Sequence, residues 1–266
     1  MNIVIVTVPG ENKRLFVNSL YKRTGGKVDL VIIQKRNPNH RSFFASIKHL
    51  YKTAGLLLLP RELWYAFLLR IDKSARNALE YFRVHGEQTS PETGYLPNVV
   101  EVDSVNSDEV FDTLRKLSPD LMVVWGNTIL KSHIVGTARR AINLHMGLCP
   151  YYRGAVANQY ALINNEPERI GATIHYVEEK VDSGDILETI LADTTKPPRE
   201  LFRNLNDRAE ERYLEIAHKL FLSGNLPTKS QDMAQGKNFM LKDWIPSVRY
   251  KLAKQILEWE KTGVFR

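Results

Sequence analysis

The chain has 266 residues, 43% of them hydrophobic, which is enough to bury a sizeable core and form one large domain with an appendage. Its single cysteine, Cys149, excludes intramolecular disulfides and cysteine-rich zinc sites. The formal net charge of +7 suits a protein that handles anions such as phosphates, carboxylates or nucleic acid. The longest apolar stretch, residues 54–59, is far shorter than the roughly 20 residues that a membrane span needs.

The chain opens with Met-Asn-Ile-Val-Ile-Val-Thr-Val, which lacks the basic region and the cleavage site of a signal peptide. We therefore expect a cytoplasmic protein in which Cys149 is a reduced, inert thiol. The basic residues are not interleaved with aromatic ones, as a nucleic-acid platform would require, so we expect no nucleic-acid partner.

Strands and helices alternate along the first half of the chain. Buried strands are indicated by runs of β-branched and aliphatic residues, and the second predicted helix begins at the good N-terminal signals Ser107 and Asp108. The alternation predicts an α/β fold with a Rossmann-like, doubly wound, mostly parallel sheet. We expect strands at 3–8, 28–33, 98–102 and 121–125, and helices at 11–23 and 107–117.

Residues 41–85 have the pattern of additional helices, because apolar side chains recur at helical spacing with Lys and Arg between them. Packing of these helices onto the sheet is the favoured interpretation. The alternatives are a dimer contact and a basic amphipathic surface that touches a membrane. The apolar positions are Phe43, Ile47, Leu50, Ala54, Trp64, Phe67, Leu68, Ile71, Ala75, Leu79 and Phe82.

An amide and an imidazole follow the next predicted strand. Ala141 and Ile142 have the composition of a strand end, and Asn143 and His145 are two positions apart. On an extended chain, residues i and i+2 point to the same side, so both side chains share one face at the carboxyl end of the strand. In an open α/β sheet, ligands bind at this edge. Asn143 and His145 are therefore candidate site residues.

A carboxylate follows the strand predicted at 171–177. Asp182, Ser183 and Gly184 lie in a polar turn, where an Asp is also a common turn former. From this turn the carboxylate of Asp182 could reach the imidazole and hold its tautomer, as a buried acid does beside a catalytic base. The remaining chain, from Lys196, predicts a helix that ends at Gly224 and a last helix at about 247–261.

Together these residues resemble a known family. The chain carries Asn-x-His, a proline, Tyr-Arg-Gly, Asn-x-Glu and Asp-x-Gly-x-Ile-Leu in the order found in N10-formyltetrahydrofolate-dependent formyltransferases. The resemblance is strong over residues 107–187, and the chain is most similar to the nucleotide-sugar N-formyltransferases. One departure is the run Met146-Gly147-Leu148-Cys149-Pro150, where the family usually has Pro-Ser-Leu-Leu-Pro.

The resemblance implies a formyltransferase catalytic domain at 1–195, in which 41–85 is a helical insertion, and a C-terminal extension at 196–266. It implies that Asn143 donates to the oxyanion, that His145 takes a proton from the attacking amine, and that Asp182 orients the imidazole. N10-formyltetrahydrofolate would be the formyl donor, with no metal. The implied folate-binding residues are Gly126, Asn127, Ile129, Leu130, Val177 and Gly184.

The acceptor is chosen by exclusion. The first turn has one glycine, Gly10, followed by Glu11, which would repel a phosphate and so disfavours glycinamide ribonucleotide. The C-terminal part lacks the strand pattern of the barrel found in methionyl-tRNA formyltransferases. We therefore expect the amino group of a nucleotide-linked amino sugar, with folate and this sugar as the small-molecule partners and a homodimer left open. The alternatives are transfer to glycinamide ribonucleotide or methionyl-tRNA, and hydrolysis of formyltetrahydrofolate.

Overall fold

A computed structural model describes residues 1–35, 43–126 and 129–265, with the backbone alone for 43–50 and 52–54. The centre is a seven-stranded sheet in the order β3-β2-β1-β4-β5-β7-β8. Its strands are β1 (Ile3–Thr7), β2 (Val28–Gln34), β3 (Val99–Val102), β4 (Leu121–Trp125), β5 (Ala141–His145), β7 (Gly171–Tyr176) and β8 (Ile186–Leu191). The main helices are α1 (Glu11–Arg23), α2 (Phe43–Ile71), α3 (Lys73–Glu80), α4 (Asp108–Leu117), α5 (Ser132–Val135), α6 (Ala157–Ile163), α7 (Pro198–Ser223) and α8 (Pro246–Thr262).

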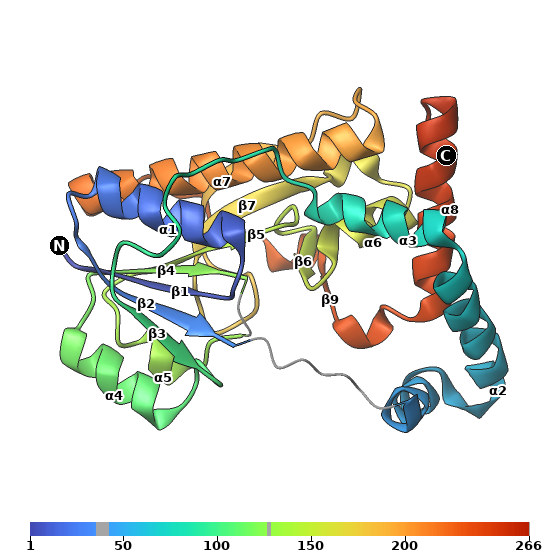
Figure 1. Cartoon of the computed structure of the whole chain (residues 1–266), viewed down its shortest axis with the longest axis horizontal. Coiled ribbons are helices and arrows are strands. Elements are labelled where there is room, and N and C mark those ends of the chain that lie inside the picture. The colour runs from blue at the N-terminus through green and yellow to red at the C-terminus, as the bar shows by residue number, and fades with distance from the viewer. Residues whose placement is uncertain (36–42, 127–128, 266) are drawn as a thin grey trace.

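The first five strands of the sheet are parallel, and β7 and β8 are antiparallel additions at one side. Helices α1 and α7 cover one face of the sheet, whereas α4 and α5 cover the other (Figure 1). Each central strand is buried on both faces, which is why it consists of aliphatic residues. The predicted α/β fold with a mostly parallel, doubly wound sheet is confirmed.

Helix α7 belongs to the core under the sheet. Its Tyr213 is fully buried, and its one hydroxyl proton is shared between the carbonyl oxygens of Val124 and Ile142, which lie 2.8 and 2.9 Å from the hydroxyl oxygen. The hydroxyl oxygen also accepts from the N–H of Val124 at 3.1 Å. Tyr213 thus joins α7 to the neighbouring strands β4 and β5, next to Asn143. The domain boundary at 195/196 stays a prediction.

Strand β5 is longer than predicted. The sequence analysis places the end of this strand at Ala141 and Ile142, but the strand continues to His145. The reason is its partner: β7 pairs with it in antiparallel register, with Asn143 opposite His175 and His145 opposite Thr173. The backbone pairing satisfies the strand, so the polar side chains are carried in extended conformation.

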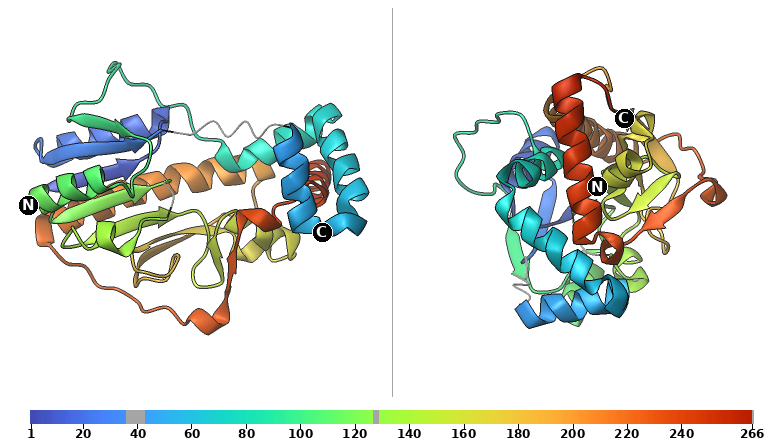
Figure 2. Two further views of the ribbon diagram at one scale, coloured as in Figure 1. Left: turned by 90° about the horizontal axis from the view of Figure 1, so that it is seen from below. Right: turned by 90° about the vertical axis from the view of Figure 1, so that its right-hand side faces the viewer.

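At the far end of the molecule, α2, α3 and α8 pack against one another (Figure 2). The expectation that the 41–85 helices pack their apolar side chains against the core holds for Ala75, Leu79 and Phe82 but is wrong for Trp64, Phe67 and Ile71, which are exposed. The reason is that α2 contacts α8 through its opposite side, where Glu62 is fully buried. The side chains of Phe43, Ile47, Leu50 and Ala54 lie outside the described part of the chain. Within the described ranges, no helix is long and apolar enough to cross a membrane.

A small second sheet closes the loop beside the carboxyl end of β5. Strand β6 (Tyr152–Gly154) pairs in parallel with β9 (Lys237–Phe239), which the C-terminal part supplies. The Tyr152 ring stacks on Phe239 at 5.3 Å between centroids. Segments far apart in sequence are therefore joined here, and this fixes the Tyr-Arg-Gly motif.

Candidate active site

Two strands present polar side chains on one face of the sheet. Asn143 lies opposite His175 and His145 lies opposite Thr173, and partners in an antiparallel pair point to the same side. The Nδ2 atom of Asn143 lies 3.3 Å from Nε2 of His175. His145, Thr173 and His175 are buried although they are polar. Burial of this many polar groups requires partners for each of them.

Asp182 meets both imidazoles from the turn after β7. Its Oδ2 lies 3.3 Å from Nδ1 of His145, and its Oδ1 lies 3.4 Å from Nε2 of His175. The Gly154 N–H donates to Oδ2 at 2.8 Å. The structure thus brings together Asn143, His145 and Asp182, the three predicted catalytic residues, and adds His175 between the amide and the carboxylate.

The turn that carries Asp182 depends on a close backbone approach. Asp182 has a φ of 48°, in the left-handed region that asparagine and aspartate tolerate better than most residues. Two residues later, a Cβ on Gly184 would lie 2.0 Å from the carbonyl oxygen of Tyr176. Only glycine allows the turn to fold back onto β7 at this point.

The hydrogen-bond partners fix which ring nitrogen carries a proton. Nε2 of His145 lies 3.0 Å from the Tyr152 carbonyl oxygen, and Nδ1 of His175 lies 2.7 Å from the Tyr176 carbonyl oxygen. A carbonyl oxygen only accepts, so both of these nitrogens donate. The other nitrogen of each ring faces the Asp182 carboxylate, which also only accepts and therefore favours the form of the ring that carries a proton there.

That Asp182 holds the tautomer of His145 stays a prediction. The Tyr152 carbonyl occupies Nε2 of the ring. Asp182 faces the other nitrogen, Nδ1. A carboxylate there stabilises the imidazolium that forms when His145 acts as a base.

Burial sets the charge states. Desolvation lowers the pKa of the His145 imidazole, although the Asp182 carboxylate opposes this. Burial would raise the pKa of Asp182, but the two imidazoles and the Gly154 N–H outweigh it and lower the pKa to about 2. At neutral pH the site therefore holds a neutral imidazole beside a carboxylate anion. This is the charge state that a general base needs.

The loop at residues 146–150, which departs from the family pattern, packs closely against His145 and Thr173. A Cβ on Gly147 would lie 2.3 Å from Nε2 of His145, so a side chain at 147 would displace the imidazole. Thr173 donates through Oγ1 to the Gly147 carbonyl at 2.8 Å and accepts from the Cys149 N–H at 3.0 Å. The glycine thus gives the loop a close approach to His145.

Cys149 lies in this loop but lacks the properties of a nucleophile. The thiol is buried, and desolvation raises its pKa to about 12. A reactive cysteine needs a lowered pKa and access to solvent. Within residues 1–35, 43–126 and 129–265, no group of three His, Cys, Asp or Glu side chains is placed to hold a metal ion.

The predicted folate-binding residues have different surroundings. Gly126 follows β4 with a φ of 79°, Ile129 is exposed, and Leu130 is buried among the side chains under α4. Val177 is partly buried against the same cluster, and its N–H donates to the Ala141 carbonyl. Asn127 lies outside the described residues. The folate-binding roles stay predictions.

The side chain of Asn106 makes hydrogen bonds to the backbone of Ile129 and Lys131, which follow β4 in sequence. It donates to the Ile129 carbonyl at 3.0 Å and accepts from the Lys131 N–H at 2.8 Å, across 23 and 25 positions of sequence. The sequence analysis missed Asn106, His175 and Thr173. A signal existed for the last two, which stand two positions apart on the strand predicted at 171–177, the spacing that identified Asn143 and His145.

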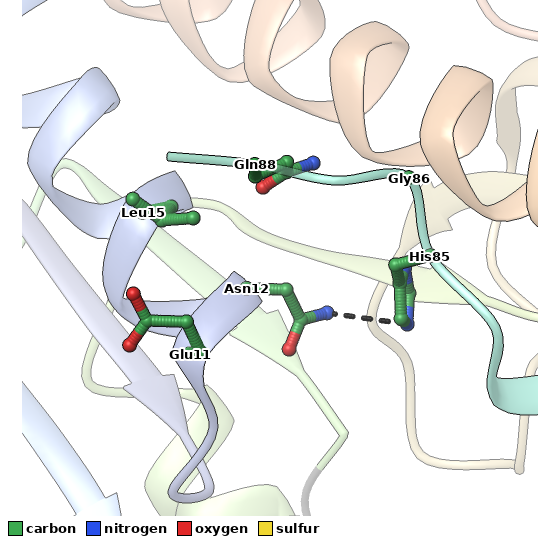
Figure 3. Close-up of a pocket in the computed structure, with 6 residues that line it drawn as sticks. All are labelled: Glu11, Asn12, Leu15, His85, Gly86 and Gln88. Atoms are coloured by element: carbon green, nitrogen blue, oxygen red, sulfur yellow. Dashed lines mark hydrogen bonds between the residues drawn. The ribbon is translucent and has the colours of Figure 1, made fainter. Parts of the chain in front are cut away.

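A second polar hollow, of about 210 Å³, lies at the start of α1, on the same carboxyl edge of the parallel strands (Figure 3). The buried Glu210 of α7 accepts from Asn12 at 2.7 Å, and its Oε1 lies 2.8 Å from Nδ1 of His85. The lining of this space includes one carboxylate, from Glu11, and two amides, from Asn12 and Gln88. Its lining residues are Glu11, Asn12, Leu15, His85, Gly86 and Gln88.

Comparisons with known proteins agree with this geometry. The formyl transferase family matches residues 73–216, more than half of the chain. A methionyl-tRNA formyltransferase of Syntrophus aciditrophicus is 37% identical over 118 residues, which cover 44% of this chain and 37% of that protein. One of Fusobacterium nucleatum is 27% identical over 167 residues, 62% of this chain and 51% of that protein. The chain thus spans about a third to a half of the curated relatives it matches.

Solved structures share the fold. An N-formyltransferase of Helicobacter canadensis, determined with folinic acid and dTDP-3-aminofucose, has a TM-score of 0.54 at 13% identity, covering 97% of this chain and 82% of that one. A phosphoribosylglycinamide formyltransferase of Bacillus halodurans has a TM-score of 0.52 at 18% identity, covering 84% and 97%. From the family match over residues 73–216, and with the fold and the sheet-edge site in agreement, this chain belongs to the formyl transferase family.

Proposed function

We propose that this chain transfers the formyl group of N10-formyltetrahydrofolate to a primary amine, the amino group of a nucleotide-linked amino sugar. The single observation that carries the proposal is the meeting of Asn143, His145 and Asp182 at the carboxyl end of β5. An amide donor, a neutral imidazole and a carboxylate are the groups that direct transfer to an amine requires.

The reaction joins the amine nitrogen to the formyl carbon. As the carbon becomes tetrahedral, its oxygen gains negative charge, and the Asn143 side-chain NH2 is the donor proposed to stabilise it. The attacking nitrogen loses a proton to Nδ1 of His145, and the resulting imidazolium is stabilised by Asp182 at 3.3 Å. The bond from the carbon to N10 then breaks, and N10 takes a proton as tetrahydrofolate leaves.

Asn143 can act in this way while it keeps its contact with His175. Its Nδ2 lies 3.3 Å from Nε2 of that ring, so one of its two N–H groups is engaged and the other is available. His175 fixes the plane of the amide, and its own Nδ1 donates to the Tyr176 carbonyl. This support favours a preorganised donor, which costs no reorganisation during the reaction.

One feature disfavours glycinamide ribonucleotide as the acceptor. The hollow at the start of α1 is lined by Glu11, and Asn12 beside it donates to the buried Glu210, so a phosphate would meet negative charge there. Sugar hydroxyls and amines, by contrast, donate well to carboxylates and amides. Solved neighbours of the same fold include both a sugar N-formyltransferase of Shewanella, with a TM-score of 0.54 and 16% identity, and the phosphoribosylglycinamide formyltransferase named above, so the shared fold does not choose between the acceptors.

The competing acceptor is methionyl-tRNA, because the curated relatives that match the chain carry that name. A panel of acceptors separates the possibilities: dTDP- and UDP-linked amino sugars, glycinamide ribonucleotide, charged initiator tRNA, and no amine. We expect tetrahydrofolate to form with an amino sugar and formamide product to accumulate in equal amount. Turnover with tRNA alone would overturn the sugar assignment, and formate release at full rate without amine would identify a hydrolase.

A further inference from the structure

Helix α2 buries a charged residue and exposes several large apolar residues, the reverse of what is usual for a surface helix. Glu62 is fully buried, whereas Leu57 is 94% exposed and Leu56 is 70% exposed. A helix that rests on a core usually buries its apolar side and exposes its charges. The exposed apolar side of α2 therefore requires an explanation of its own.

The exposed apolar residues share one side of the helix after Gly55, where a non-helical φ of 76° divides α2. They recur at intervals of three, four and seven, the spacing that aligns side chains along one face. Trp64 and Phe67 contact each other, with ring centroids 5.7 Å apart. We call this set the outer face of α2; it consists of Leu56, Leu57, Pro60, Leu63, Trp64, Phe67 and Ile71.

The inner side of the same helix is anchored. Glu62 accepts from the Ser247 N–H at 2.9 Å and from the Ser247 hydroxyl at 2.7 Å, at the start of α8. A carboxylate at a helix N-terminus is stabilised by the helix dipole as well as by these hydrogen bonds. Leu69 is buried on this side too. The outer face is thus held in its orientation and is not a loosely packed core.

The charges around the outer face are of one sign. Arg61 and Arg70 are exposed at its two edges, and Lys73 and Arg76 continue the basic surface along α3. The two carboxylates between residues 55 and 76 point elsewhere: Glu62 is buried, and Asp72 binds Lys254 and caps α3. Arg61 also contacts Glu62, at 3.0 Å, but remains half exposed.

We propose that the outer face of α2 docks on the surface of an anionic lipid bilayer. An apolar stripe with aromatic residues and a basic border is the composition of a helix that lies in the membrane interface. Lipid headgroups complement the Arg and Lys side chains, and the acyl region accepts Leu57, Trp64 and Phe67. A second copy of the chain complements the apolar stripe but brings like charges together across a twofold axis.

Vesicle sedimentation with the full chain tests the proposal. We expect the wild type to sediment with phosphatidylcholine vesicles that contain about one third phosphatidylglycerol, and less with phosphatidylcholine alone. Leu57→Glu should weaken this binding roughly tenfold or more, since burial of one leucine contributes about that factor. Arg70→Gln should weaken it about fivefold, the contribution of one basic residue near an anionic surface.

The matched control is Leu222→Glu, because Leu222 is 68% exposed on α7, outside the outer face. It should leave vesicle binding unchanged, and circular dichroism should show that all variants keep the wild-type fold. Trp64→Phe should remove the blue shift of tryptophan emission that vesicles cause. Equal sedimentation of wild type and Leu57→Glu would overturn the proposal. A dimer that Leu57→Glu dissociates, with no vesicle binding, would assign the outer face to a second copy instead.

Discussion

The edge of the sheet at β5 and β7 and the outer face of α2 depart in opposite ways from the usual distribution of polar residues. At the sheet edge, His145, His175 and Asp182 are largely buried, and each has a partner within 3.4 Å. On α2, Leu57 and Trp64 stand in solvent while Glu62 is inside. Buried polar groups cost free energy unless they are paired, and exposed apolar groups gain it only when covered.

The two regions differ in where the partners of their unusual side chains come from. The sheet edge is complete within the chain, because carbonyls, the Gly154 N–H and Asp182 satisfy both imidazoles. The outer face of α2 is complete only with a partner. The first region should therefore respond to substitution in rate, and the second in association.

Removal of the base is expected to have the largest effect. His145→Ala should lower kcat by about 100- to 10,000-fold, because it removes the proposed general base. Single-turnover measurement of tetrahydrofolate release reports the chemical step. The thermal unfolding midpoint should change little beyond the effect of a cavity. Wild-type turnover in a folded His145→Ala protein would remove this residue from the mechanism.

Loss of the oxyanion donor should come next. Asn143→Ala should lower kcat roughly 100- to 1000-fold with a smaller change in KM, because the amide is proposed to bind the transition state and not the ground state. Asn225→Ala is the control, since Asn225 is an exposed amide in the loop after α7. An effect on KM alone would make Asn143 a substrate-binding residue instead.

The anchor of α2 should matter for stability and not for rate. Glu62→Ala leaves the Ser247 N–H without its carboxylate partner and should lower the free energy of unfolding by about 1–3 kcal/mol. Chemical denaturation measures this difference. Glu80→Ala is the control, because Glu80 is exposed and paired with Arg83 on the surface, and should change stability by less than about 0.5 kcal/mol.

The smallest expected effect is on the pH dependence of the rate, which reports the environment of the His145 imidazole. Burial lowers the pKa of His145, so kcat/KM should hold constant down to pH 6.5 and fall only below it, about tenfold per pH unit once the base is protonated. The Asp182 carboxylate opposes this lowering, so Asp182→Asn should move the acid limb to still lower pH. A limb with its midpoint above 6.5 would contradict a buried neutral base.

The sequence by itself determined the sheet and the two-residue spacing of Asn143 and His145. Both follow from local rules: aliphatic runs make buried strands, and alternate residues on a strand share a face. The family pattern also pointed to Asp182. Thr173 and His175 obey the same alternation, so their signal was present on the strand predicted at 171–177, although it was not used.

Tertiary structure alone decided which groups satisfy the site and which side of α2 is buried. The partner of Nε2 of His145 is the backbone carbonyl of Tyr152, and backbone contacts cannot be read from side-chain patterns. Periodicity located an apolar stripe on α2, but it does not say what the stripe faces. Helix α8 decides this, because Ser247 donates two hydrogen bonds to the Glu62 carboxylate and so buries that side of α2, which leaves the leucines on the opposite side exposed.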